Sequence, residues 1–185
     1  MGVANWWGVV NGRGVWNPKL VAGTNALADA ARAGKWSRVF EVLDGSEFCF
    51  TPEVNTWRAG GSSWFASLHR AACLGAPISV VTELLDRGGW TSLRDSWGRR
   101  PADIARERSH HAVAELIEPS SARRGELREE DVAAMNRHLA DVVDGRARMI
   151  FDPTRIVLRH VDVTLLFEDA GPSEIWFPIP GMYGG

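Results

Sequence analysis

The nine residues SLHRAACLG at positions 67–75 decide the fold of this chain, because a related stretch follows them at a fixed distance. The second stretch, PADIARERS at positions 101–109, begins 34 residues later and keeps small residues at corresponding positions. An earlier copy of the same character runs over positions 23–34. Such self-similarity is the signature of a repeat protein, in which each unit buries its apolar face against its neighbours.

Each copy is followed by a segment whose apolar residues recur at helical spacing. That spacing places them on one helix face, which a neighbouring helix can cover. The apolar residues are Val39, Val42 and Leu43, then Val80, Val81, Leu84 and Leu85, and finally Val113, Leu116 and Ile117. We therefore expect about three helix pairs in a row, with the alanines of the first helices allowing close approach.

The repeat resembles the ankyrin repeat, whose period is about 33 residues. The resemblance implies a hairpin around residues 95–101 and a turn in which His69 hydrogen-bonds to the backbone. The repeats are degenerate, because Asp103 stands where the family usually has His and Ser67 where it usually has Pro. The first junction is longer than the second, which indicates an insertion within residues 45–63. Two tryptophans there or just after it, Trp57 and Trp64, predict an ordered loop.

The segments outside the repeats suggest a different architecture. Residues 1–22 form a Trp-containing leader, residues 23–118 the stack, and residues 126–185 a C-terminal region. Acidic residues open a helix at 126–143, which Gly145 is expected to end. Apolar residues at 156–158, alternating apolar residues at 161–167 and then 175–177 predict strands, with a turn at 169–172 that suggests an antiparallel hairpin. The predicted fold class is α+β, with the helix pairs followed by a helix and a small antiparallel β element.

The last ten residues, WFPIPGMYGG at 176–185, resemble a motif in uncharacterised bacterial ankyrin-repeat proteins. In those proteins further strands follow the motif. The resemblance implies that the small sheet is incomplete in this chain. An exposed sheet edge invites pairing with another chain, so self-association through this edge is one expected property.

Composition narrows the range of partners. The net charge of −2 provides no general attraction to nucleic acid or to an anionic membrane. No stretch has the roughly 18 consecutive apolar residues of a membrane span. Cys49 and Cys73 lack the spacing of a disulfide framework or a zinc site. We therefore expect a cytoplasmic protein that binds another protein, without a cofactor or a metal.

Few residues are arranged for catalysis. The five histidines come from separate regions, and ligation of a metal needs three or four groups. His69 and Cys73, one helical turn apart, are the minimum pair for a thiolate nucleophile, but no third group is apparent to orient them. The alternative enzymatic hypothesis places an active site in the C-terminal region, among Arg155, Arg159, His160, Asp162 and Glu168.

Ankyrin-type stacks usually bind through hairpin tips and the outward positions of their first helices. On this chain that expectation selects Arg32, Phe65, Cys73, Leu74, Ser96, Trp97, Arg99, Glu107 and Arg108. Trp97 is the strongest candidate, because the hairpin tip does not require a bulky apolar residue and Trp is enriched at binding hot spots. The alternative is that Trp97 packs on Trp64 or Trp90. The predicted function is a protein-protein interaction module, with an enzyme or a self-assembling protein as alternatives.

Overall fold

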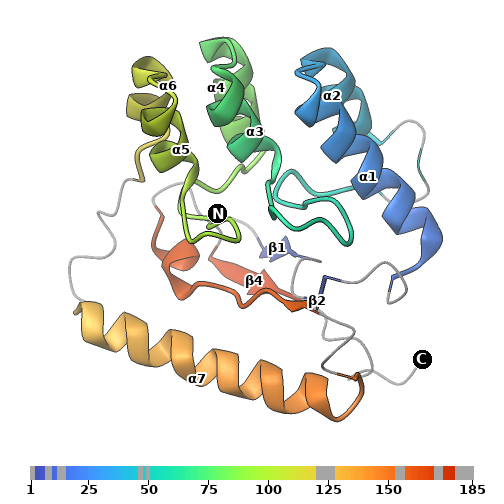
Figure 1. The fold of residues 1–185 in the computed structure, drawn as a ribbon, viewed down its shortest axis with the longest axis vertical. Coiled ribbons are helices and arrows are strands. Elements are labelled where there is room, and N and C mark those ends of the chain that lie inside the picture. The colour runs from blue at the N-terminus through green and yellow to red at the C-terminus, as the bar shows by residue number, and fades with distance from the viewer. Residues whose placement is uncertain are drawn as a thin grey trace.

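The computed structural model describes residues 3–6, 10–11, 16–45, 48, 51–119, 128–152, 157–168 and 173–177. The described chain is mainly helical, with strands of only two or three residues. Three helix pairs stand side by side, and a long helix lies on the far side of the short strands (Figure 1). This arrangement leaves loops of the stack facing the segments from the two ends of the chain.

The six stacked helices alternate between a first and a second helix of each pair. Their bounds are α1 Pro18–Arg32, α2 Trp36–Leu43, α3 Ser67–Leu74, α4 Ile78–Asp86, α5 Pro101–Glu107 and α6 His111–Leu116. Helix α3 contacts both α1 and α5, so the first helices form a continuous layer. The expected three helix pairs are therefore present as helices.

The turn within each pair has the same geometry three times. One residue in each turn has a left-handed backbone, with φ of 67° at Gly34 and of 60° at Gly75 and Ser109. The next backbone N–H donates back to the first helix, at 2.8–3.0 Å, to the carbonyl oxygens of Ala30, Ala71 and Ala105. Ser109 bears the conformational cost that glycine avoids at the other two turns.

The start of the first helix is also fixed in a repeated way. The backbone N–H of Ala66 donates to Nδ1 of His69 at 3.3 Å, which confirms the expected role of this histidine. In the next repeat, the N–H of Arg100 donates to Oδ2 of Asp103 at 2.8 Å. A side chain at the third helical position that accepts from the capping residue is half of a capping box. Asp103 thus replaces His without loss of the contact.

The core of the stack is built from small and aliphatic side chains. Fully buried members from all three pairs include Leu27, Val39, Leu68, Ala71, Leu84, Ala102, Ile104 and Ile117. Alanines on the first helices allow their backbones to approach, while the valines and leucines of the second helices fill the space between pairs. The inserted loop is ordered where the structure describes it, and its Trp57 is buried.

A second core joins the two ends of the chain to the loops of the stack. Strand β1, Val3–Asn5, pairs in parallel with β4, Glu174–Trp176, and β2, Val10–Asn11, pairs antiparallel with β3, Val157–Leu158. Helix α7, Glu129–Arg148, and a 3₁₀ helix at Val163–Phe167 complete it. Its buried side chains include three tryptophans, Trp6, Trp57 and Trp90, beside aliphatic residues such as Val143 and Leu165.

The predicted antiparallel hairpin is wrong. Residues 163–167 form the 3₁₀ helix, because the Asp162 carboxylate accepts the N–H of Thr164 and the Asn136 side chain accepts the N–H of Val163. These caps stabilise a helical turn despite the alternating apolar pattern. Strand β4 does form, but its described partner is β1 in parallel orientation.

Two predicted boundaries also differ. Helix α1 begins at Pro18, inside the predicted leader, because the Asn17 side chain accepts the N–H of Lys19 and Pro suits the first helical position. Helix α7 continues past Gly145 to Arg148. Its last turns are held in place because Val143 and Ala147 are buried.

Some expectations concern parts of the chain that the structure does not describe. The last eight residues of the tail motif, 178–185, are outside the described residues, and association through a sheet edge stays a prediction. No helix in the described ranges is both long enough and apolar enough to cross a membrane.

Candidate partner-binding face

The hairpin before α5 holds Trp97 outward by contacts that do not involve its indole ring. The buried Asp95 carboxylate accepts the backbone N–H groups of Trp97 and Arg99 at 2.8 and 2.9 Å, and it also accepts Nε of Arg99. Gly98 provides the left-handed residue of the turn, with φ of 79°. The turn is thus complete without the Trp97 side chain, which is 64% exposed.

Trp97 belongs to a row of stacked cations and rings. The Arg70 guanidinium lies 4.6 Å from the centre of the Phe65 ring, and the Phe65 ring meets Trp97 edge-on at 6.4 Å. The Arg99 guanidinium lies 5.0 Å from the Trp97 ring and also pairs with Glu107 at 2.8 Å. We call these five residues the Trp97 face. Cation–π and edge-on contacts keep the exposed indole in a defined position.

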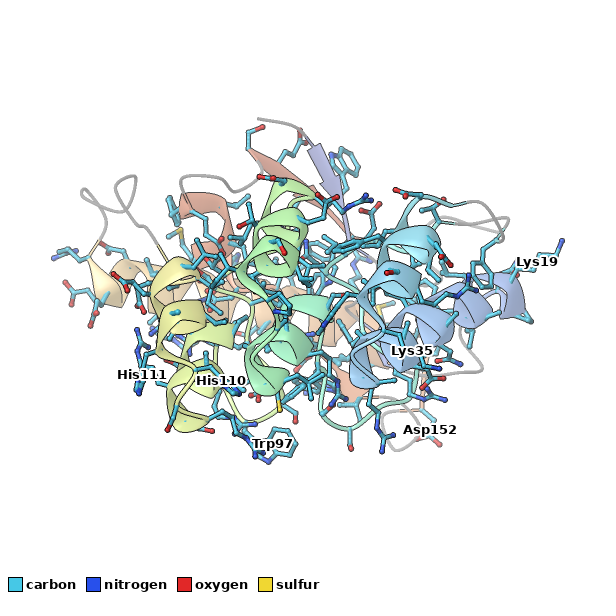
Figure 2. The ribbon with its side chains drawn as sticks, turned by 90° about the horizontal axis from the view of Figure 1, so that it is seen from above. Lys19, Lys35, Trp97, His110, His111 and Asp152 are labelled. Carbon is cyan, nitrogen blue, oxygen red and sulfur yellow. The ribbon has the colours of Figure 1, made fainter. Side chains whose placement is uncertain are left out.

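The other predicted site residues lie at repeated positions of the first helices. Arg32, Cys73 and Glu107 each stand two residues before the left-handed residue of their turn, and Leu74 and Arg108 stand one residue before it. Leu74 and Arg108 are exposed, as is Arg32, whereas Cys73 is half-buried. Lys35 and His110, which follow the same turn residues, lie along the side of the molecule on which Trp97 projects (Figure 2).

Ser96 has a different role from the rest of the predicted site. Its backbone N–H donates to the carbonyl of Ser63 at 3.2 Å, which ties this hairpin to the preceding one. Phe65, Trp97, Arg99 and Glu107 are therefore brought into one contact row, while Arg32, Leu74 and Arg108 lie at the ends of three neighbouring helices. Among the described residues, the Trp97 ring contacts Phe65 and Arg99, whereas Trp64 and Trp90 pack in the second core.

Arg70 is the residue of this face that sequence reasoning missed. It is one helical turn before Cys73, and residues at that spacing share a helix face, which was the available signal. Burial lowers the pKa of Arg70, an effect that Cys73 opposes and the nearby Arg32 cation reinforces. Two like charges that repel each other at a half-buried position favour an anionic group from a partner.

The pair of His69 and Cys73 does not form a nucleophile. Burial lowers the pKa of His69 to about 3, with the Arg159 cation adding to the shift and the Leu93 backbone opposing it. The ring is neutral near pH 7, and its Nδ1 is already occupied by the N–H of Ala66. It stacks on Phe65 with 5.5 Å between ring centres. Nor do three His, Cys, Asp or Glu side chains gather as a metal site anywhere in the described residues.

The residues of the alternative enzymatic hypothesis separate into two groups. Arg159, His160 and Asp162 line an open groove of about 480 Å³, between α7 and the hairpin loop at residues 93–98. Glu168 points elsewhere, because its carboxylate accepts the N–H groups of Thr91 and Ser92 at 3.0 and 2.6 Å. Arg155 lies outside the described residues.

Arg159 is the centre of the second core. It is 4% exposed, and its guanidinium lies within 4.4–5.6 Å of the ring centres of Trp6, Trp57 and Trp64. It donates to the backbone carbonyls of Trp64 and Arg94. Burial lowers the pKa of Arg159 to about 9, against an opposing effect of Asp95. Because its described hydrogen bonds go to carbonyl groups of the stack, Arg159 fastens the C-terminal region to it.

Comparison with known proteins gives partial similarities. No family model matches the chain. A stretch of 60 residues, 31% of the chain, is 50% identical to the E3 ubiquitin-protein ligase hecd-1 of Caenorhabditis elegans. A stretch of 121 residues, 64% of the chain, is 31% identical to the E3 ubiquitin-protein ligase Ufd4 of Drosophila melanogaster. These stretches cover only 2% and 4% of the two curated relatives.

Proposed function

We propose that this chain is an ankyrin-type module that binds another protein through the Trp97 face. The observation that carries the proposal is the exposed Trp97 indole, which is held between Phe65 and Arg99 although the turn does not need it. A large exposed ring in a fixed position loses little conformational freedom on binding, which is typical of hot-spot residues.

The ankyrin assignment is supported by backbone geometry as well as by sequence spacing. The left-handed residues Gly75 and Ser109 are 34 residues apart, as are Trp64 and Gly98, which have positive φ at the hairpins. The side chains of His69 and Asp103 accept from equivalent backbone positions. Repetition of both the turn and the helix start is what a stack of one supersecondary unit requires.

The charge of the face favours an acidic partner segment. Arg70 and Arg32 repel each other, and the described residues offer Arg70 no ion-pair partner. Next to this pair, Phe65 and Trp97 present aromatic surface. A segment with an acidic side chain near an apolar one would satisfy both features. A cytoplasmic location is part of the same proposal.

The similar stretches in known proteins are too short to transfer an activity to this chain. Each similar stretch makes up at most 4% of an E3 ubiquitin-protein ligase. We therefore do not assign ligase activity to the chain.

A selection of peptide ligands tests the proposal, and it does not require the natural partner. Peptides selected from a displayed random library on the immobilised protein are synthesised, and their dissociation constants are measured by calorimetry. Trp97→Ala should weaken binding by about 30-fold, which corresponds to about 2 kcal/mol for a hot-spot residue. Circular dichroism should be unchanged, because the indole is not part of the turn.

Trp176→Ala is the matched control, since Trp176 is also exposed, at 55%, but lies on β4. The control should bind the peptides as the parent does. The proposal is overturned if no peptide is selected, or if the selected peptides bind the Trp97→Ala and Trp176→Ala proteins equally well.

A further inference from the structure

The open groove between α7 and the hairpin loop has a composition that suits a ligand. Its volume of about 480 Å³ is within the range typical of small-molecule sites. One wall is apolar and includes Trp64, Leu93 and Leu158, while Ala140 lies on the α7 side. None of the five residues of the Trp97 face lines this groove, although Ser96 and Gly98, which flank Trp97 in the chain, do.

The charged side chains that line the groove are unequally engaged. Arg94 and Arg137 contribute cationic groups, whereas Nε2 of His160 is already paired with the Asp144 carboxylate at 2.7 Å. Arg137 has no hydrogen-bond or ion-pair partner within the part of the chain that the structure describes, and it lies in the middle of α7. Arg94 donates to the Gly98 carbonyl and, at 3.4 Å, to Asp162. Both arginines retain N–H groups for a ligand, because a guanidinium carries five of them.

The two acidic residues of the groove are occupied by the protein itself. Asp95 has no exposed side-chain surface and accepts the contacts of the hairpin turn described above. Asp162 accepts from the Asn136 side chain at 2.9 Å and from the N–H of Thr164 at 3.0 Å. Their acceptor capacity is largely used within the fold, whereas donors remain available at the groove surface. A ligand that enters it should therefore be an acceptor.

We propose that this groove binds a small organic anion, whose acidic group contacts Arg137 and Arg94 and whose apolar body lies against Trp64 and Leu158. The volume of about 480 Å³ fits a molecule of one or two rings. The acidic group can be a carboxylate or a phosphate, since arginine pairs with both through parallel N–H donors. The proposal does not depend on the function of the Trp97 face.

The test uses the whole chain and three probes that share one ring system: 2-naphthoate, 2-naphthyl phosphate and the neutral 2-naphthamide. Binding is measured by calorimetry. We expect at least one anionic probe to bind saturably, and the amide to bind at least roughly tenfold more weakly, because it lacks charge-assisted hydrogen bonds. The probe that binds more tightly identifies the acidic group. Competition by inorganic phosphate as strong as that by 2-naphthyl phosphate would overturn the proposal, since the apolar wall would contribute nothing.

Variants separate the groove from general surface attraction. Arg137→Gln should weaken binding of the anionic probes by at least roughly tenfold. Ala140→Phe should also weaken their binding, because the larger side chain fills the groove without a change of charge. Arg146→Gln on the same helix is the matched control and should bind as the parent does. The proposal fails if neither anion binds saturably, or if both groove variants bind as tightly as the control. Trp97→Ala should leave this binding unchanged, so the two functional proposals can fail separately.

Discussion

The two cores of this protein are assembled from different material. The stack core consists of alanine, valine, leucine and isoleucine, contributed by helices that are neighbours in sequence. The second core combines three buried tryptophans with aliphatic residues, and it joins Trp6 to residues more than 130 positions away, such as Val143 and Leu165. It also contains a buried cation, Arg159, and a buried carboxylate, Glu168. The stack core is therefore formed by repeated contacts between helices close in sequence. The second core also contains charged groups, and it forms only when residues from both ends of the described chain come together.

The largest expected effect tests whether the cores unfold together. Trp6 is 1% exposed and lies 5.7 and 5.8 Å from the ring centres of Trp57 and Trp90. Trp6→Ala should lower the free energy of unfolding by about 4 kcal/mol, because it leaves a large cavity. Urea unfolding followed by both fluorescence and circular dichroism measures this loss. Coincident curves would show one cooperative unit, whereas an earlier fluorescence transition would show that the stack survives alone.

Glu168 tests the polar part of the second core. Glu168→Gln should destabilise the protein by about 3 kcal/mol, because the amide group meets backbone N–H donors that need an acceptor. Chemical denaturation measures the change. Glu115→Gln is the control, since Glu115 is exposed on α6, and it should change stability by less than about 0.5 kcal/mol. Equal losses of stability in both variants would contradict a stabilising role for the hydrogen bonds that Glu168 accepts from Thr91 and Ser92.

His69 lies where the two cores meet, and it predicts a dependence on pH. Its pKa in the folded protein is about 3, below the ordinary value of 6.5. The unfolded chain therefore takes up the proton first as pH falls, and the stability present above pH 6.5 is lost progressively toward pH 3. Between pH 7 and pH 5 this group should account for a loss of about 2 kcal/mol.

The pH effect is measured by denaturation at both pH values in the parent and in His69→Gln. His69→Gln should lose less free energy of unfolding between pH 7 and pH 5 than the parent loses. His111→Gln, at an exposed position, should lose as much as the parent does. An identical loss in parent and His69→Gln would show that other groups control the acid sensitivity.

The smallest expected effect concerns the repeated helix start. Asp103→His should change stability by less than about 0.5 kcal/mol, because the imidazole can accept the Arg100 N–H as His69 accepts that of Ala66. Asp103→Ala should cost about 1 kcal/mol, since the N–H loses its acceptor. Thermal unfolding of Asp103→His and Asp103→Ala, compared with the parent, measures both changes of stability. If His proves no better than Ala, the two helix starts are not equivalent.

The same contrast explains what the sequence could predict. The stack was predictable because each helix pair is specified within a short segment, by apolar spacing and by residues such as Gly34 and Gly75. The second core was not, since β1 and β2 are three and two residues long and find their partners at the other end of the chain. The apolar alternation at 161–167 indicated a strand, but side-chain caps from Asp162 and Asn136 produced a helical turn.

Prediction of the candidate site was limited in a similar way. Positions set by the repeat, such as Phe65, Trp97 and Glu107, were found because equivalent positions project toward the same side. Arg70 was missed because its importance comes from a contact across the face, over the Phe65 ring. Nothing in the sequence around Arg159 indicates burial, since an arginine next to a histidine is ordinarily a surface pattern.

The tryptophan cluster also gives the protein a built-in optical reporter. Five of the nine tryptophans, Trp6, Trp16, Trp57, Trp64 and Trp90, belong to the second core or pack against it. Most of the intrinsic emission of the chain should therefore come from the junction between its ends and the stack. A ligand or variant that loosens this junction should shift the fluorescence emission maximum and change its intensity. The far-ultraviolet circular dichroism should stay unchanged where the helices remain intact.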